Sequence, residues 1–331
     1  MKLAVYLLCF LIGSTTWAKE DPLPSWREGQ TKQSILKFVS EVTTENGKAF
    51  VKPEDRIATF DNDGTLWSEV PTVEVEFAKV RFQEVLKKDP SLKQVEPYKS
   101  LLEKGKAAVP TLTQKQILDI LARTLAGMSE DDFATEAREF YTKARHPKLN
   151  LPYAQTGYQP MIELMAYLRA NNFKVFISSG GDTSFMRVVA TEMYNVPSEN
   201  IIGSYFTDKT IEQNGKLTIQ RTAQLGMMND KEGKPVGILR HIGKRPIFSA
   251  GNVRSGGDVE HLRYSSEGPG TTLQLMINHD DAEREAAYVE KDGRSLAAAK
   301  KYGWKIISMK NDWKDIFIKQ PALVQSGLQS N

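Results

Sequence analysis

One short stretch of the chain decides the fold: Arg56-Ile57-Ala58-Thr59-Phe60 followed by Asp61-Asn62-Asp63-Gly64-Thr65. Its first half combines apolar and β-branched residues, which is typical of a strand. Its second half is rich in aspartate and glycine and therefore predicts a turn. A strand that runs directly into an acidic turn indicates a functional site at the carboxyl end of that strand.

The segments around this stretch predict an α/β protein. Apolar residues at helical spacing predict helices at 31–43, 160–170 and 184–194. Further strands are expected at 173–177, 201–202, 246–250, 273–277 and 304–307, and Asn214-Gly215 predicts a hairpin between 210–211 and 217–219. Strands that alternate with helices form a mainly parallel sheet through right-handed crossovers. Such a sheet binds ligands at the carboxyl ends of its strands, near the switch point in strand order.

The segment 70–153 carries helical patterns and no convincing strand. Thr113 with Gln116, for example, has the spacing of a capping box. We therefore expect residues 70–153 to form a helical insert. The α/β core would consist of residues 19–69 and 154–320, followed by a C-terminal tail at 321–331.

The composition is that of an ordinary folded protein. The 331 residues include 44 Lys and Arg against 41 Asp and Glu, a net charge of +3, with 40% hydrophobic residues. The apolar content argues against disorder. The balance of charge argues against a dedicated nucleic-acid binder, which normally has a concentrated basic excess.

The first residues predict export. Residues 1–18 combine a basic start at Lys2, an apolar run too short to span a bilayer, and a small-residue ending at Ala18. We expect cleavage after Ala18 and a soluble periplasmic or secreted chain with no stable membrane insertion. The single cysteine, Cys9, lies within this signal. The mature chain would therefore have no disulfide, no thiolate metal site and no cysteine nucleophile.

Polar groups follow three of the predicted strands. They are Asp61 and Asp63, then Ser179, then Gly251, Asn252 and Asp258, with Lys234 or Lys244 just before the third strand. Together these groups suit phosphoryl transfer. A carboxylate can attack phosphorus and form an aspartyl phosphate. Mg²⁺ favours oxygen ligands and would neutralise both the carboxylate and the phosphate. A hydroxyl, backbone N–H groups and a lysine can hold the remaining phosphate oxygens.

The motifs resemble those of the haloacid dehalogenase superfamily, in its phosphoserine phosphatase-like branch. Asp61 to Thr65 resembles the DxDGT signature, and Ser179-Gly180-Gly181 resembles the second motif. Gly233-Lys234-Pro235 or Gly243-Lys244-Arg245-Pro246 fits the third motif, and Gly251-Asn252 through Asp258 the fourth. The stretch 279–285 is similar to secreted members. The resemblance covers roughly residues 57–317 and implies a Rossmann-like α/β core with a helical cap inserted between the first two motifs.

The resemblance also implies roles. Asp61 would be the nucleophile and a Mg²⁺ ligand. Asp63 would bind the metal through its backbone carbonyl and act as general acid and then general base, a residue that phosphatases of this superfamily carry and its dehalogenases lack. Ser179, Gly180 and Lys234 would bind the phosphate, with Lys244 as the second choice for the lysine.

The fourth motif departs from the family pattern. The family commonly has Gly-Asp where this chain has Gly251-Asn252, and two extra residues precede Asp258. An asparagine can ligate a metal through its amide oxygen but brings no negative charge. Asn252 and Asp258 are therefore both candidate metal ligands, and we expect Asp258 to approach the metal directly or through one water.

The expected substrate is a small phosphorylated metabolite, because a cap of this length leaves a small site. Trp67 and Glu69 follow the first motif and Arg145 lies at the far end of the insert, so all three are candidate substrate contacts. The same chemistry permits a phosphotransferase that uses an alcohol acceptor, and the fold permits a non-catalytic extracytoplasmic binding protein. The sequence does not indicate an oligomeric state.

Three features near the motifs have structural interpretations. His279 with Asp280-Asp281 follows a predicted strand, and acids there suit the start of a helix. Asp258 can cap the helix that begins at Val259 as well as serve the site. Lys244 with Arg245 is expected to be a solvated pair.

Overall fold

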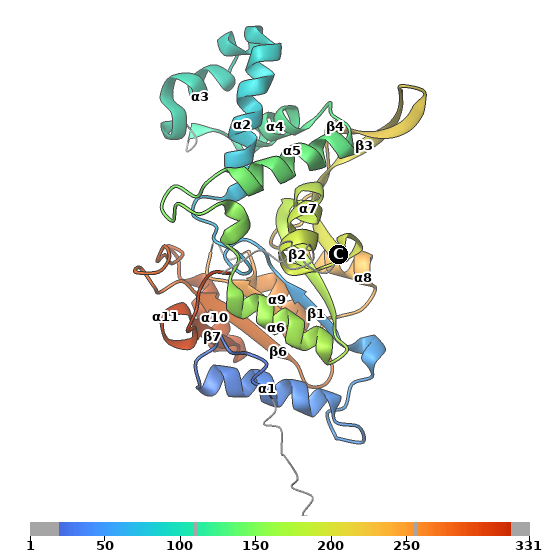
Figure 1. Ribbon diagram of the computed structural model, residues 1–331, viewed down its shortest axis with the longest axis vertical. Helices are drawn as coiled ribbons and strands as arrows, with labels where there is room; N and C mark the ends of the chain where they lie inside the picture. The colour runs from blue at the N-terminus through green and yellow to red at the C-terminus, as the bar shows by residue number, and fades with distance from the viewer. Residues whose placement is uncertain (1–19, 109–110, 255–256, 319–331) are drawn as a thin grey trace, which may run out of the picture.

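A computed structural model describes residues 20–108, 111–254 and 257–318 of the chain (Figure 1). They form a seven-stranded sheet with the order β4-β3-β2-β1-β5-β6-β7. The predicted signal, residues 1–18, and the predicted tail, residues 321–331, lie outside the described residues. No helix within the described ranges is long and apolar enough to cross a membrane.

The α/β fold class is confirmed. The strands are β1 Ile57–Phe60, β2 Lys174–Asp182, β3 Ile201–Gln213, β4 Lys216–Met227, β5 Phe248–Asn252, β6 Leu273–Asn278 and β7 Lys305–Ser308. All neighbouring strands pair in parallel except β3 and β4. Every residue of β1 is buried, because neighbouring strands flank it and helices cover both faces of the sheet.

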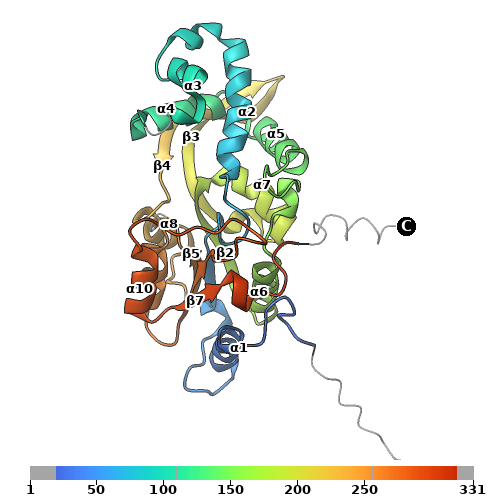
Figure 2. The same cartoon turned by 90° about the vertical axis from the view of Figure 1, so that its left-hand side faces the viewer.

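Helices cover the two faces of this sheet (Figure 2). One face carries α1 Gln30–Thr43, α6 Gln159–Ala170 and α7 Thr183–Tyr194, whose apolar sides share one buried cluster. The other face carries α8 Gly233–Ile242, α9 Val259–Ser266 and α10 Arg294–Tyr302. A short helix, α11 Met309–Asp312, follows β7. The sheet is thus the middle layer of a three-layer core.

Between β1 and β2 the chain forms helices above this core (Figure 1). They are α2 Val73–Lys88, α3 Tyr98–Lys104, α4 Gln114–Leu125 and α5 Glu130–Lys143. Thr113 forms the capping box that its spacing predicts, since its side chain accepts from the Gln116 N–H while Gln116 accepts from the Thr113 N–H. We call these helices the cap.

The hairpin of β3 and β4 is much longer than the predicted one and joins the cap. Asn214 and Gly215 both have positive φ, as a two-residue hairpin turn requires. Beyond the core, the hairpin pairs with the cap: the Gly127 N–H donates to the Arg221 carbonyl at 2.9 Å, and the Arg221 N–H donates to the Met128 carbonyl at 3.0 Å. The part of the molecule above the core is therefore not made of residues 70–153 alone, because it also includes the hairpin.

The expected helix at His279 is wrong. The segment forms turns, because its polar side chains bind groups from distant parts of the chain. Glu285 is buried and accepts from the Ser68 hydroxyl at 2.7 Å. Arg284 donates to the carbonyls of Met309 at 2.8 Å and Trp313 at 3.1 Å. These partners fix an irregular backbone that a helix could not match.

Candidate active site

The acidic turn after β1 lies at the carboxyl end of the sheet. Strand β1 lies between β2 and β5, and the Asp61 N–H donates to the Ala250 carbonyl at 2.9 Å. Gly64 has a φ of +69°, and a Cβ there would lie 1.9 Å from Asn252 Nδ2. Glycine therefore meets two requirements at once, a left-handed backbone and a close approach of the fourth motif.

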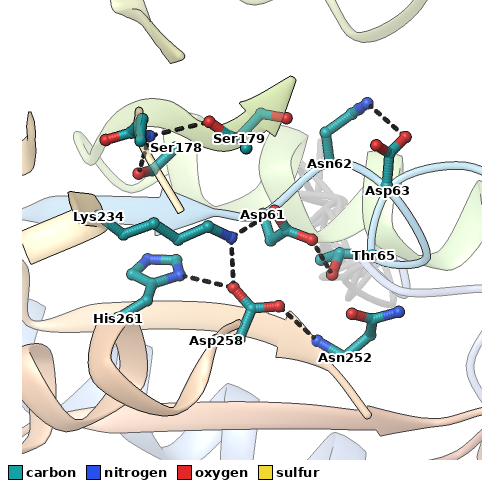
Figure 3. Close-up of polar contacts among 12 residues, drawn as sticks. Asp61, Asn62, Asp63, Thr65, Ser178, Ser179, Lys234, Asn252, Asp258 and His261 are labelled. Carbon is teal, nitrogen blue, oxygen red and sulfur yellow. Dashed lines mark hydrogen bonds and ion pairs between the residues drawn. The ribbon is translucent and has the colours of Figure 1, made fainter. Parts of the chain in front are cut away.

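Lys234 joins the two acidic motifs (Figure 3). It lies in the first turn of α8, and its Nζ is 2.6 Å from Asp61 Oδ1 and 2.5 Å from Asp258 Oδ1. All three side chains are buried. The alternative lysine, Lys244, lies on the surface and pairs with Asp55 at 2.6 Å, so the structure does not bring it to the site.

The Lys234 ammonium group contacts two carboxylates, and the pKa values of these carboxylates differ. Burial and the charge of Asp258 raise the pKa of Asp61 well above its usual range. Burial also acts to raise the pKa of Asp258, but Lys234 and His261 hold it below its usual range. Burial acts to lower the pKa of Lys234, yet the two carboxylates keep it above its usual value. The pKa values of Asp61 and Asp258 therefore shift in opposite directions, although both carboxylates contact the same lysine.

Asp63 is held by Trp67. The indole Nε1 donates to Asp63 Oδ1 at 2.6 Å, and the indole is fully buried. Burial raises the pKa of Asp63 to about 6, although the hydrogen bond from Trp67 acts in the opposite direction. Trp67 does not line the cavity that Asp61 and Asp63 line. Its hydrogen bond to Asp63 orients that carboxylate, and the predicted substrate contact stays a prediction.

The second motif reaches the same place from the end of β2. Gly180 and Gly181 line the cavity. Ser179 is buried, and its Oγ accepts a hydrogen bond from the Gly181 N–H at 3.0 Å. Asn229 Nδ2 donates to the Ser179 carbonyl at 2.9 Å. At this end of β2 the glycine backbone lines the cavity, and the Ser179 hydroxyl holds the Gly181 N–H.

The fourth motif is organised around Asn252 and Asp258. The Asn252 N–H donates to Asp258 Oδ2 at 3.1 Å, and Asn252 Nδ2 donates to Glu69 Oε1 at 2.6 Å and to the Tyr288 hydroxyl at 3.2 Å. Within the described ranges the Asn252 amide makes hydrogen bonds through its nitrogen only, which leaves Oδ1 available as a ligand. The Asp258 side chain does not cap α9. Instead, its Oδ1 contacts Lys234 and its Oδ2 accepts from the Asn252 N–H.

Two predicted substrate contacts on or near the cap have different positions. Glu69 lines the cavity, and its Oε2 pairs with Arg254 at 2.7 Å. Arg145 does not line the cavity. Its guanidinium donates to Oδ1 and the carbonyl of Asn150 at 3.0 and 2.6 Å, so it closes an exposed loop. The prediction for Arg145 is therefore not supported.

The cavity has a volume of about 140 Å³ and contains no apolar side chain among its described lining residues, which are Asp61, Asp63, Glu69, Gly180, Gly181, Asp230, Lys234, Asn252, Arg254, Gly257 and Asp258. A larger groove of about 320 Å³ lies between α5 and α7 and contains none of the motif residues. Of these two spaces in the described part of the chain, the smaller cavity is the one that combines a ligand-sized space with the candidate chemistry.

Sequence reasoning missed several groups at the site: Asp230, Arg254, His261 and Tyr288. His261 is the one with a visible signal, because it follows Asp258 by one helical turn. Its Nε2 lies 2.8 Å from Thr59 Oγ1 and its Nδ1 lies 3.4 Å from Asp258 Oδ1. Tyr288 reaches the site through the irregular segment after β6, and no local pattern predicts that path.

Comparison with known proteins identifies one family. A family model described as haloacid dehalogenase-like hydrolase matches residues 58–234, more than half of the chain. No curated protein matches the sequence. Among solved structures, a conserved protein of unknown function from Anaerococcus prevotii DSM 20548 has 15% identity and a TM-score of 0.48, over 76% of this chain and 86% of its own.

Two further structures are also similar. A protein of unknown function from Bordetella pertussis Tohama I has 17% identity and a TM-score of 0.47, over 76% of this chain and 97% of its own. A probable phosphoserine phosphatase from Vibrio cholerae has 16% identity and a TM-score of 0.38, over 84% and 77%. At these TM-scores the structures give no basis for transferring a function.

Proposed function

The chain belongs to the haloacid dehalogenase-like hydrolase family, and from this premise we propose that it is a Mg²⁺-dependent phosphatase acting on a small, polar phosphomonoester through an aspartyl phosphate. The observation that carries the proposal is the pair of aspartates on one turn. Asp61 contacts the buried Lys234, and Asp63 has a pKa raised to about 6. This arrangement supports attack by one carboxylate and proton transfer by the other.

The reaction has two balanced halves. In the first, an oxygen of Asp61 forms a bond to phosphorus, the bond to the ester oxygen breaks, and Asp63 gives its proton to the departing alcohol. In the second, Asp63 takes a proton from water, the water oxygen bonds to phosphorus, and the phosphate leaves Asp61. Lys234 and the Gly180 N–H at the end of β2 would stabilise the negative charge that builds on the phosphoryl oxygens.

The donor groups fit a hard divalent cation. Asp61, the Asp63 carbonyl and Asn252 Oδ1 would supply oxygen ligands, with Asp258 ionised next to them. The described residues contain no group of three His, Cys, Asp or Glu side chains that could hold a metal ion. Mg²⁺ needs few such ligands, because it retains several waters. When bound, the ion would neutralise Asp61 and the phosphate.

The cavity supports the substrate class. Its described lining contains no apolar side chain, and its volume of about 140 Å³ suits a phosphate with a short leaving group. A nucleobase or a long apolar chain would find no apolar side chain to pack against there. The expected substrate is therefore a small phosphorylated metabolite.

The test begins with a chromogenic phosphate ester, measured with and without Mg²⁺, followed by a screen of small esters. Asp61→Asn should fold normally and lose turnover, because no other carboxylate replaces the attacking one. Acid quenching of the wild-type reaction should give a phosphorylated peptide that contains Asp61. Turnover by Asp61→Asn at the wild-type rate would refute the covalent mechanism. Transfer of phosphate to an added alcohol would identify a phosphotransferase instead.

We also propose that the protein is exported. The basis is the pattern of residues 1–18, with no cysteine after Cys9. N-terminal sequencing of protein from the producing cell should begin at Lys19 or within a few residues of it. Recovery of only the full-length chain from the cytoplasm would contradict this proposal.

A further inference from the structure

The end of β2, which carries the second motif, is in contact with the cap. Glu74 lies in the first turn of α2, and both of its carboxylate oxygens accept from the Asp182 N–H, at 2.9 and 3.1 Å. The same carboxylate presses against Gly181, where a Cβ would lie 2.2 Å from Glu74 Oε1. A side chain at position 181 would therefore displace the Glu74 carboxylate from the end of β2.

A second contact comes from the hairpin. Arg221 in β4 is buried, and its Nη2 lies 2.6 Å from Asp182 Oδ2. Its Nη1 lies 2.9 Å from Glu130 Oε1 in the cap, and its guanidinium carbon lies 4.0 Å from the ring centre of Phe133. One guanidinium group thus connects the hairpin, helix α5 and the end of β2.

Asp182 is the point where these contacts meet. Its Oδ1 accepts from the N–H groups of Ser184 and Phe185 and so caps α7. Its N–H is bound by Glu74 and its other oxygen by Arg221. The two residues before it, Gly180 and Gly181, line the active-site cavity. The conformation of this cavity wall is therefore set by side chains from the cap and the hairpin.

We propose that Glu74 and Arg221 are positioning residues for phosphate binding, which act through Asp182 on Gly180 and Gly181 at the end of β2. This inference rests on the proposed phosphatase function. In the proposed function the phosphate binds against Gly180 and Gly181, so loss of Glu74 should weaken the binding of phosphate itself and affect every ester alike. A residue that selected the leaving group would instead change the ranking of substrates.

The test compares three variants of the full mature chain: Glu74→Ala, Glu74→Gln and the control Glu76→Ala. Glu76 lies two residues further along the same helix, is partly exposed and pairs with Lys79. Its replacement therefore makes the same chemical change away from the end of β2. Glu74→Gln keeps an oxygen that can accept from the Asp182 N–H. The two measurements are amide hydrogen exchange of the peptide that contains residues 180–183, and the affinity for inorganic phosphate.

In Glu74→Ala we expect at least tenfold faster amide exchange in residues 180–183 and at least tenfold weaker phosphate binding. Glu74→Gln should stay within about threefold of wild type, and Glu76→Ala should equal it. Unchanged exchange in Glu74→Ala, or phosphate affinity equal to that of Glu76→Ala, would overturn the inference. If the wild type binds no phosphate, the proposed function fails. The exchange measurement still decides whether Glu74 stabilises the end of β2.

Discussion

Replacement of Lys234 with methionine should both destabilise the protein and abolish its activity. The Nζ lies 2.6 Å from Asp61 and 2.5 Å from Asp258, and all three side chains are buried. At an effective dielectric constant of about 20, each contact corresponds to about 6 kcal/mol of Coulomb attraction. Desolvation of the three groups offsets much of this attraction. Removal of one partner from a buried pair typically costs about 3–5 kcal/mol, which is the loss we expect at pH 7.

This cost should depend on pH. Burial and Asp258 already raise the pKa of Asp61, and loss of the ammonium would raise it further. A carboxyl whose pKa is raised in the folded state stabilises the folded protein while it is protonated. This contribution is fully present below the unfolded-state pKa and is lost as the pH rises through the folded-state pKa. Lys234→Met should therefore lose less stability at pH 5 than at pH 8.

A second substitution separates stability from chemistry. In Lys234→Met/Asp258→Asn one of the two uncompensated carboxylates is gone, so at least half of the lost stability should return while activity stays absent. Lys244→Met is the matched control, because Lys244 pairs with Asp55 on the surface and should change stability by no more than about 0.5 kcal/mol. Thermal and urea unfolding measure stability, and phosphate release measures activity. A Lys234→Met variant as stable as Lys244→Met would refute the electrostatic reasoning.

Two other substitutions test the acid and the unusual fourth motif. Asp63→Asn should lose about 10²–10⁴-fold in kcat/KM on an alkyl phosphate and less on p-nitrophenyl phosphate, whose leaving group needs no proton; the wild-type rate on the alkyl ester should fall as pH rises above about 6, and equal losses on both esters would contradict the role of acid. Asn252→Asp should lower the melting temperature at pH 8, because a carboxylate would replace the amide nitrogen 2.6 Å from Glu69 Oε1. Glu69→Gln in the same chain should restore it, and failure of this rescue would show that the two positions are not coupled.

Much of the core was predictable because its signals are local. A buried parallel strand needs a short apolar run, and three of the predicted runs are followed by polar groups at the same edge of the sheet. The choice of Lys234 over Lys244 agrees with the geometry for a local reason. Lys234 lies in the first turn of a helix, beside the carboxyl ends of the strands. Lys244 lies past the other end of that helix.

The remaining parts depend on contacts between distant segments. The length of the hairpin follows from its pairing with Gly127 and Met128 in the cap, which no pattern within residues 201–227 reveals. The helix expected at His279 fails because Glu285 finds buried partners in Ser68 and Tyr158. Acidic residues after a strand favour a helix only when nothing else satisfies them.

The replacement of the family aspartate by Asn252 has a consistent electrostatic explanation. The described cavity lining carries five carboxylates, from Asp61, Asp63, Glu69, Asp230 and Asp258, against the two cations of Lys234 and Arg254. A further aspartate at position 252 would add a charge to a wall that already repels a phosphate dianion. Glu69 instead supplies a carboxylate one hydrogen bond away, and Arg254 offsets it at 2.7 Å. The acidic character of the motif is thus kept nearby in a compensated form, while the amide oxygen at position 252 remains free to bind a cation.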